Sequence, residues 1–289
     1  MTDRITTLAI TELHLFRDNP FKVRKDEAFD ELVESVSADG IYDPLIVSPD
    51  KDSGGYVIIS GQRRFEAAKT AGLKTVPAVV KDMDKDDMII AMVDNNICSR
   101  NILVSEKAFA YKLKSEALKH QGKHLENTSG QVVPKPESNR TTAQIGEENG
   151  ESYKTVQRYI RLTNLIPGLL KMVDENRIAF SVGVELSYLD EDKQTLLLGL
   201  IGEYDCTPSY SQANRMHKDH LSGMLTPGTM KLLMSEEKAN QKTVYKVQAE
   251  KLSKYMKPDI TPEQAEAFII KACEYYSKYL SRQKNKDAR

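Results

Sequence analysis

The hydrophobic and polar positions between residues 7 and 80 follow two periods in turn. The short apolar runs at 44–48 and 56–60 have the length and β-branched composition of strands, and residues 7–16 also predict a strand. Residues 27–40 repeat their apolar positions every three or four residues and end at a glycine, which predicts a helix. Alternating strands and helices predict a small α/β or α+β domain.

One unit of this region combines a strand, a glycine turn and a helix. The strand 56–60 leads into Gly61, a helical pattern follows from Arg63 to Ala71, and another strand follows at 76–80. A glycine at such a turn lets a ligand approach the backbone closely, and the free N–H groups of a helix N-terminus attract anions. The unit is therefore a candidate phosphate site.

Two arginines follow this glycine almost directly. Arg63 and Arg64 carry guanidinium groups whose planar fork matches phosphate oxygens. The alternative is a surface turn with two solvated arginines, because glycine turns are common. The sequence of the turn alone leaves both interpretations open.

Beyond Asp84 the pattern becomes mainly helical. Residues 86–97 predict one helix, and Ser105 has the position of an N-cap for a second helix over 106–122. The segment 122–140 is rich in Gly, Pro, Ser and Asn, which predicts a loop or linker.

Residues 141–165 have the spacing of a helix-turn-helix. That motif needs a small residue where the helices cross, a glycine at the turn, and an aliphatic residue that faces the core from the second helix. Gly146, Gly150 and Val156 stand at those places. Ser152 is the expected N-cap of the second helix.

The second helix of this motif is locally basic. The segment 152–171 contains four basic residues and no acidic residue. Arg and Gln side chains match the edges of guanine and adenine in the major groove. The predicted DNA-binding residues are Ser152, Tyr153, Lys154, Gln157, Arg158 and Arg161. The alternative is an ordinary helical hairpin with a solvated basic face, which the acidic Glu147 and Glu148 of the first helix favour.

The rest of the chain predicts more helices and a separate end module. Four helices are predicted at 166–178, 181–189, 191–204 and 209–221. Thr261 to Gln264 have the spacing of a capping box, and an apolar stripe runs from Ala265 to Leu280. This stripe either packs on its own domain or forms a dimer face. Residues 281–289 predict a basic, frayed tail.

These patterns divide the chain into three predicted domains. An α+β domain covers residues 1–104, and a helical domain covers 105–222 with the helix-turn-helix at about 141–165. A small C-terminal module covers 223–289. The predicted fold class is thus an α+β N-terminal domain followed by a mainly α-helical region.

Composition narrows the class of protein. The chain has 289 residues, of which 40% are hydrophobic and 29% charged, as in ordinary globular proteins. It has no apolar run of about 18 residues, so we expect no membrane span. The N-terminus lacks the apolar core of a signal peptide, so a cytoplasmic location is expected. The net charge of −1 means that a DNA-binding surface must concentrate its positive charge locally.

Cysteine and histidine spacing gives no sign of a metal site. The three cysteines are far apart and form no CxxC pair, so neither a disulfide framework nor a zinc site is expected. His217 and His220 are close together, but no HExxH pattern accompanies them.

In their order along the chain, these motifs resemble the ParB family of DNA-partition proteins, in its plasmid or mobile-element branch. LHLFRDNPFKVR (13–24) resembles the opening motif of that family. SGQRRFEAAKTAGL (60–73) resembles its glycine–acid–Arg–Arg signature, with Gln62 in the place of the acid. SEKAFAYKLKSEALKHQG (105–122) resembles the helix after its asparagine motif, and the likeness extends over about residues 5–220.

The resemblance implies ligands and partners. It implies a sulfiredoxin-like N-terminal domain that binds CTP and Mg²⁺, and a helix-turn-helix that reads a palindromic centromere-like site in double-stranded DNA. It also implies a homodimer, a ParA-type ATPase as partner, and a cytoplasmic location on the nucleoid or a plasmid. The implied nucleotide-binding residues are Gly61, Gln62, Arg63, Arg64, Asn95, Asn96 and Arg100, and Asn96 is also the implied Mg²⁺ ligand.

The chain departs from this family at the asparagine motif, E-N-x-x-R. If Asn96 takes the place of the asparagine, Asn95 replaces the glutamate, Ser99 replaces the arginine, and Arg100 comes one residue late. One residue turns a helix by about 100°, so Arg100 would point elsewhere. The missing carboxylate also removes an oxygen ligand that suits Mg²⁺. We therefore expect CTP binding with weak or absent hydrolysis.

Two other functions fit parts of the pattern. A nucleoid-occlusion or transcription regulator would have the same architecture and differ only in its DNA sites and partners. A small-molecule kinase would use the N-terminal fold alone and would leave the helix-turn-helix unexplained. A sulfiredoxin-like reductase would need a cysteine in the glycine turn, where this chain has Gln62.

Overall fold

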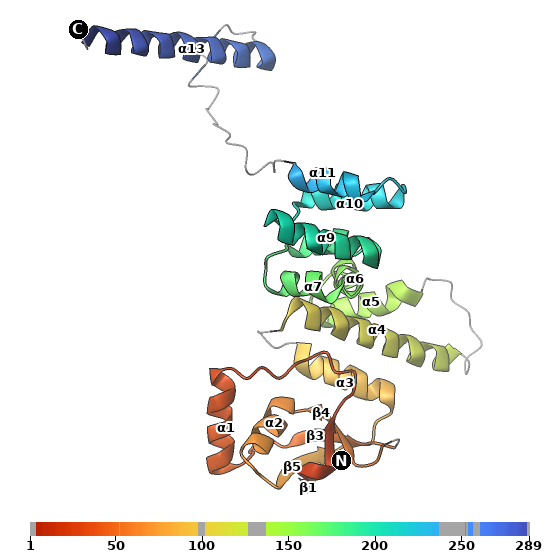
Figure 1. The fold of residues 1–289 in the computed structure, drawn as a ribbon. Coiled ribbons are helices and arrows are strands. Elements are labelled where there is room, and N and C mark those ends of the chain that lie inside the picture. The colour runs from red at the N-terminus through yellow and green to blue at the C-terminus, as the bar shows by residue number, and fades with distance from the viewer. Residues whose placement is uncertain are drawn as a thin grey trace. The chain divides into compact units, whose positions relative to one another are not determined.

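The structure is a computed structural model that describes residues 4–51, 53–97, 102–126, 137–236, 252, 254–256 and 261–287. The chain divides into two compact units, Met1–Glu236 and Glu237–Arg289. The first unit begins with an α+β region and continues with helices alone (Figure 1). This order confirms the predicted fold class. The predicted domain boundaries near residues 104 and 222 stay predictions.

A five-stranded mixed sheet forms the centre of the α+β region. Its strand order is β1-β5-β3-β4-β2. β1 is antiparallel to β5 and β3 to β4, while β2 is parallel to β4 and β3 to β5. The strands are β1 (Ile5–Ala9), β2 (Leu13–Leu15), β3 (Leu45–Pro49), β4 (Tyr56–Ser60) and β5 (Thr75–Val80).

The single strand predicted at 7–16 is wrong, because the chain turns within it. A short 3₁₀ helix, η1 (Ile10–Glu12), separates β1 from β2. The Glu12 carboxylate accepts a hydrogen bond from the Ala9 N–H at 3.1 Å, which stabilises the turn. β1 and β2 then lie at opposite edges of the sheet. An apolar run does not show whether one strand continues or two strands pair with different partners.

Strand β4 is buried on both faces of the sheet. Ile58 belongs to a hydrophobic cluster with α1 (Glu27–Asp39) and α2 (Gln62–Thr70). Its neighbours Val57 and Ile59 belong to a second cluster with α3 (Lys85–Ile97) and the helices after it. Because side chains alternate along a strand, a strand that is covered on both faces needs a continuous apolar run.

Helix α4 (Val104–Glu126) begins differently from the prediction. Ser105 is not its N-cap, because Ser105 lies inside the helix and its hydroxyl donates to Asp174 Oδ2 at 2.6 Å. The Glu106 carboxylate instead accepts a hydrogen bond from the Leu103 N–H at 3.0 Å. The Ser105 hydroxyl is therefore used in a contact with a residue distant in the sequence and does not cap the helix.

The predicted linker at 122–140 is shorter than expected. Helix α4 continues past Gly122, and α5 begins at Glu137. Residues 127–136 of the predicted linker lie outside the described residues.

Helices α5 (Glu137–Glu148) and α6 (Tyr153–Leu162) confirm the predicted helix-turn-helix. Ile145 and Val156 are fully buried. Gly150 in the turn has a φ of 67°, a left-handed conformation that favours glycine. The Ser152 hydroxyl caps α6 by accepting a hydrogen bond from the Thr155 N–H at 3.1 Å. At Gly146 the helix passes so close to the turn that a Cβ would lie 2.5 Å from the Glu151 carbonyl oxygen.

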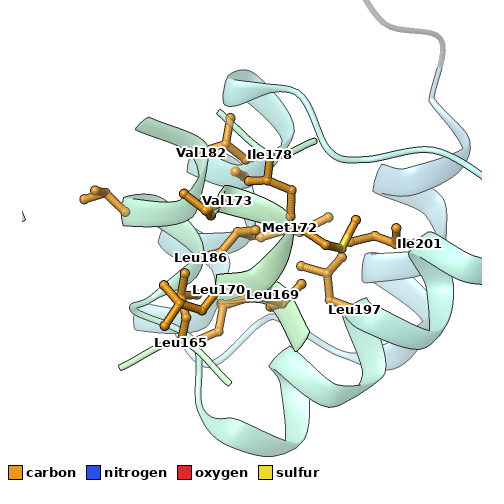
Figure 2. Packing of buried hydrophobic residues seen from close by; sticks show 14 of the residues in the cluster. Leu165, Leu169, Leu170, Met172, Val173, Ile178, Val182, Leu186, Leu197 and Ile201 are labelled. Atoms are coloured by element: carbon orange, nitrogen blue, oxygen red, sulfur yellow. The ribbon is translucent and has the colours of Figure 1, made fainter. Parts of the chain in front are cut away.

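The following helices form a separate hydrophobic cluster (Figure 2). The four helices predicted there are confirmed, and α11 adds a helix that the sequence pattern did not predict. Leu169, Leu186 and Leu197 are fully buried in this cluster. The helices are α7 (Pro167–Asp174), α8 (Phe180–Leu186), α9 (Glu191–Tyr204), α10 (Tyr210–Leu221) and α11 (Pro227–Ser235).

The described part of the second unit contains α13 (Pro262–Asp287). Thr261 and Gln264 exchange backbone-to-side-chain hydrogen bonds of 3.3 and 3.4 Å, which confirms the predicted capping box. The predicted fraying from residue 281 is wrong as far as Asp287, because the helix continues to that residue. Within this unit the apolar side chains of Phe268, Ile269, Tyr276 and Leu280 are exposed.

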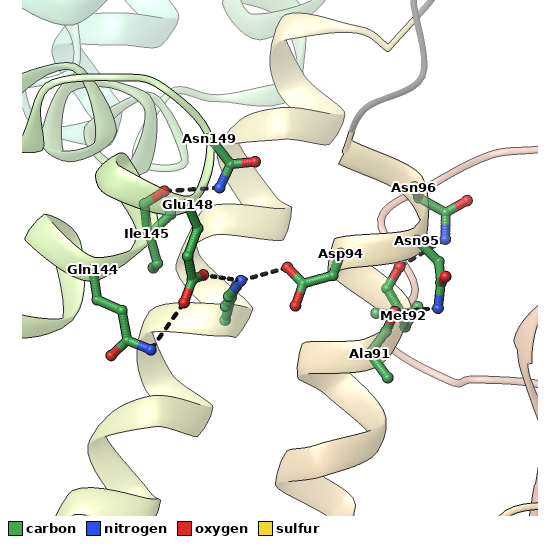
Figure 3. Close-up of polar contacts among 10 residues, drawn as sticks. Ala91, Met92, Asp94, Asn95, Asn96, Gln144, Ile145, Glu148 and Asn149 are labelled. Carbon is green, nitrogen blue, oxygen red and sulfur yellow. Dashed lines mark hydrogen bonds and ion pairs between the residues drawn. The ribbon is translucent and has the colours of Figure 1, made fainter.

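A buried lysine connects three helices of the first unit. The side chain of Lys114 in α4 is 1% exposed, and its ammonium group pairs with Asp94 of α3 and with Glu148 of α5. Figure 3 shows these two carboxylates on either side of the contact. Burial raises the pKa of Glu148, but hydrogen bonds from Lys114 and Gln144 outweigh it and hold that pKa below the usual value. A lysine this deeply buried is stable only when it is paired.

Replacement of Gly146 by alanine should destabilise the protein. The added Cβ would lie 2.5 Å from the Glu151 carbonyl oxygen, so α5 and the turn would have to separate. Overpacking of this kind costs about 1–3 kcal/mol. Gly199→Ala in α9 is the matched control, since its Cβ would meet nothing within 4 Å. Alanine gains about 1 kcal/mol over glycine in a helix, so urea unfolding should show opposite shifts. Stabilisation by both would contradict the close crossing.

The double variant Asp94→Asn with Glu148→Gln should be much less stable than the native chain. It leaves a buried ammonium group unpaired, which costs about 3–5 kcal/mol. Lys114→Met should cost less, because the freed carboxylates of Asp94 and Glu148 are 49% and 41% exposed and water can solvate them.

Chemical unfolding of both variants measures this order. Lys171→Met is the control, since its exposed pair with Glu175 should contribute only about 0–1 kcal/mol. Equal losses for Lys114→Met and the double variant would show that burial of the lysine charge does not decide the stability of this contact.

Candidate functional site

The turn between β4 and α2 requires a glycine. Gly61 is the N-cap of α2 and has a φ of 97° and a ψ of 22°, a left-handed conformation. A Cβ at this position would overlap the Leu45 side chain. The first N–H groups of α2 have no partner within the helix, and they lie at the positive end of its dipole. Because Gly61 has no side chain, it leaves these backbone N–H donors uncovered.

A cavity of about 360 Å³ adjoins this turn, and we call it the α2 cavity. Gly61, Gln62 and Arg63 form one part of its lining, and residues of the segment 21–28 form another. Asn96, at the end of α3, lines it as well, together with residues at the start of α4. The structure thus brings four of the predicted nucleotide-binding residues together.

Two arginine–carboxylate pairs form part of the wall of the α2 cavity. Arg63 Nη2 donates to Asp26 Oδ1 at 3.0 Å, and Arg24 Nη2 lies 3.6 Å from Glu106 Oε2. The hydrogen bond from Arg63 is the main reason why the pKa of Asp26 lies below its ordinary value. An anion that enters the cavity would therefore compete with Asp26 for Arg63.

Arg64 has a different position from its neighbour. Its Nη1 donates to the carbonyl oxygens of Asp43 and Pro44, in the loop between α1 and β3. Arg64 is not among the residues that line the α2 cavity. Its guanidinium group fixes the loop that leads into β3, the strand from which Leu45 packs against Gly61.

The asparagines at the end of α3 also differ from one another (Figure 3). The Asn95 amide donates to the Ala91 carbonyl and the Asn96 amide to the Met92 carbonyl, each at 2.7 Å. Asn96 lines the α2 cavity and Asn95 does not. Arg100, with Ser99, lies outside the described residues. No group of three or more His, Cys, Asp or Glu side chains that could hold a metal occurs among the described residues.

The predicted DNA-binding residues at the start of α6 are exposed. Ser152 caps the helix, and Tyr153 and Lys154 follow it on the surface. Arg158 is also exposed, with its guanidinium carbon 5.1 Å from the centre of the Phe180 ring. Lys154 and Arg158 are four residues apart and therefore lie on the same side of the helix.

Gln157 and Arg161 lie half-buried at the flank of this face. The guanidinium group of Arg161 stacks on Tyr188 at 4.0 Å from the ring centre, and its Nη2 donates to the Ser187 carbonyl at 3.2 Å. Arg161 is therefore held against the end of α8, and it is less free to reach a ligand than Lys154 or Arg158.

Several residues of the α2 cavity were not predicted from the sequence. Lys22, Arg24, Asp26 and Glu106 line it, although none was predicted as a site residue. The first three belong to the segment before α1, and Glu106 lies in the first turn of α4. The only signals were two family-like motifs, the opening motif with Lys22 and Arg24 and the motif 105–122 with Glu106, because these segments approach α2 only in the folded chain.

None of the helices in the described ranges is long and apolar enough to cross a membrane.

Comparison with known proteins finds a family that the first part of this chain resembles. Residues 1–97 match the model of the ParB N-terminal domain. The stage 0 sporulation protein J of Bacillus subtilis is 33% identical over 170 residues. The match covers 58% of this chain and 52% of that protein, so the chain spans about half the length of this curated relative.

Two solved structures of Caulobacter crescentus ParB, both truncated at the C-terminus, are also similar. One is complexed to the centromeric parS site. Its match has 21% identity and a TM-score of 0.41 and covers 74% of this chain and 99% of the Caulobacter chain. The other is complexed with CTP-γ-S, and its match has 23% identity and a TM-score of 0.32 and covers 67% of this chain and 96% of the Caulobacter chain.

The resemblance to the ParB family depends on the sequence matches. These matches do not distinguish a plasmid branch from a chromosomal one. Residues 1–97 match the ParB N-terminal domain, and the chain resembles the ParB family of DNA-partition proteins.

Proposed function

We propose that this chain is a ParB-like, sequence-specific DNA-binding protein of plasmid or chromosome partition, with an N-terminal domain that responds to CTP. One observation carries this proposal: a helix-turn-helix with an exposed basic face follows a ParB N-terminal domain in the same compact unit. The related Caulobacter protein binds a centromeric parS site, which supports the same class of ligand here.

The DNA-binding element is α6. Lys154 and Arg158 lie on its exposed face, and Gln157 lies at the flank. A second helix of this motif enters the major groove, where Gln and Arg side chains form paired hydrogen bonds with base edges. Ser152, Tyr153 and Lys154 lie at its N-terminus, where contacts with backbone phosphates position such a helix. The absence of acidic residues from 152–171 keeps this surface attractive to DNA.

The α2 cavity fits the phosphate groups of a nucleotide. Its volume of about 360 Å³ lies within the range of small-molecule sites, and Gly61 leaves the N-terminal amides of α2 open. In this proposal the amides of Gln62 and Arg63 bind phosphate oxygens, and the Arg63 guanidinium group exchanges Asp26 for the ligand. CTP is the proposed nucleotide because the related Caulobacter structure holds a CTP analogue.

Mg²⁺ would bind beside the phosphates and neutralise part of their charge. The Asn96 amide nitrogen already donates to Met92, so the amide oxygen is the atom that would bind this ion. Arg64 stays a predicted phosphate ligand, although it would have to release Asp43 and Pro44 to act as one. Asn95 and Arg100 stay predicted nucleotide contacts.

Hydrolysis of CTP would be slow or absent in this proposal. Catalysis requires the ion and the attacking water to be fixed around the γ-phosphate. Asn95 brings an amide where a carboxylate would bind Mg²⁺ more strongly, and its side chain is used within α3.

The proposed assembly is a homodimer that works with a ParA-type ATPase in the cytoplasm, on the nucleoid or a plasmid. A palindromic DNA site requires two-fold symmetry in the protein that binds it. The exposed apolar side chains of α13, which include Phe268, Ile269 and Leu280, supply a face on which two chains could pair.

Loss of base-reading side chains should relax the DNA preference of the protein. Gln157→Ala and Arg158→Ala should each cost about 1–3 kcal/mol on the preferred site and reduce discrimination at one base pair. Arg177→Ala, at an exposed arginine between α7 and α8, is the charge-matched control for Arg158→Ala.

Binding to a library of DNA duplexes, followed by sequencing, measures both effects. Unchanged sequence preference in both variants would show that α6 does not read bases. A native chain that selects no sequence at all would contradict the proposed function.

Arg63→Ala should weaken CTP binding, and Asp26→Asn should strengthen it. A charge-assisted hydrogen bond contributes about 1.5–3 kcal/mol, and Asp26→Asn frees Arg63 from its carboxylate. Asparagine is as good an N-cap as aspartate, so α1 keeps its cap in this variant.

Calorimetry with CTP measures the two affinities. Weaker binding by Asp26→Asn would show that Asp26 helps the ligand instead of competing with it. In a phosphate-release assay, Asn95→Glu with Ser99→Arg should hydrolyse CTP faster than the native chain if the motif is aligned correctly.

A further inference from the structure

A second hollow lies beside the recognition helix, between the helix-turn-helix and α4. It has a volume of about 290 Å³ and is formed between α4 and α6, with Thr142 of α5 at its wall. We call it the α4–α6 hollow. From α4 it is lined by Lys112, Ser115, Glu116 and Lys119. Successive positions three or four residues apart share one face of a helix, so these side chains form a single row.

The α4–α6 hollow has an excess of positive charge. Lys112 and Lys119 are half-buried, and neither forms an ion pair or hydrogen bond among the described residues. Arg161 lines the hollow from α6, and its Nε is buried without a hydrogen-bond partner in the described part of the chain. Glu116 is the acidic residue of the lining, and it is exposed.

This excess of charge is unusual within this region of the protein. Two other lysines of α4 are paired, since Lys107 pairs with Glu151 at 2.5 Å and Lys114 pairs with Asp94 and Glu148. Half-buried lysines lose hydration without gaining a carboxylate, which favours an anion from outside the chain. The lysines that face the hollow are therefore placed to bind a ligand.

The position of the hollow beside α6 indicates which anion it would bind. Gln157 belongs both to the predicted base-reading set and to the lining of the hollow. When α6 occupies the major groove, neighbouring elements of such a motif cross the sugar–phosphate backbone beside it. A backbone phosphate at the edge of the groove would then lie in front of α4.

We propose that the α4–α6 hollow binds a backbone phosphate of double-stranded DNA, through Lys112 and Lys119. This proposal rests on the proposed function and adds α4 to the DNA interface. Arg161 lines the hollow from α6, and Tyr188 and Ser187 hold its guanidinium group in place. The lysines set the register of α6 in the groove, and they carry no base preference of their own.

The test uses the full chain and a fluorescent random-sequence DNA duplex, with anisotropy measured over a range of salt concentrations. Lys112→Gln with Lys119→Gln removes two phosphate contacts, so the slope of log K against log salt should fall by about 2. Binding should weaken by the same factor on every sequence. Glu116→Gln should strengthen binding, because it removes the acid from the lining.

Lys218→Gln with Lys231→Gln is the matched control, since it makes the same change in net charge with exposed lysines of α10 and α11. This control should keep the native slope. A native slope and affinity in the double α4 variant would overturn the proposal and leave the proposed function intact. Failure of the native chain to bind DNA would overturn both.

Calorimetry with CTP distinguishes a DNA phosphate from a free nucleotide. The double α4 variant should bind CTP as the native chain does. Loss of CTP binding together with unchanged DNA binding would assign the hollow to a free nucleotide and overturn the proposal.

Discussion

The stability of the first unit depends on the pairing of one buried charge, the ammonium group of Lys114. At 1% exposure it has almost no access to water, so the fold is stable only while Asp94 and Glu148 remain beside it. These carboxylates belong to α3 and α5, and neither α3 nor α5 can leave α4 without leaving a charge unpaired. Asp94 lies two residues before Asn96 of the α2 cavity, and Glu148 is the last residue of α5. One buried charge thus fixes the end of the N-terminal α+β region to the first helix of the helix-turn-helix.

The same helix, α4, takes part in each candidate site. Glu106 binds the Lys22 N–H and lies near Arg24 at the α2 cavity. One position further on, Lys107 binds Glu151 in the turn of the helix-turn-helix. Lys112 and Lys119 line the α4–α6 hollow. Because a helix is stiff over this length, the two candidate sites are positioned by one element and not by a chain of loops.

The local sequence pattern predicted most helices and strands. It failed where a residue interacts with a partner that is distant in the sequence. The strand 56–60 was predictable from its apolar run, α2 from the glycine turn at Gly61, and α6 from its N-cap Ser152. Each of these signals acts over only a few residues. Ser105 looked like an N-cap, but Asp174, far along the chain, takes its hydroxyl. The division of 7–16 into two strands depends on β5 and β4, which no local window contains.

The double arginine shows most clearly what sequence leaves open in a site. Two adjacent arginines at a helix start look equivalent, yet consecutive side chains point about 100° apart around a helix. Arg63 therefore lines the α2 cavity with Asp26, while Arg64 turns to the loop carbonyls of Asp43 and Pro44. The second contact supports the first, because the loop that Arg64 fixes leads into Leu45, which packs against Gly61. The paired arginines divide two tasks between them: Arg63 offers charge to a ligand, and Arg64 keeps the glycine turn in the shape that the ligand requires.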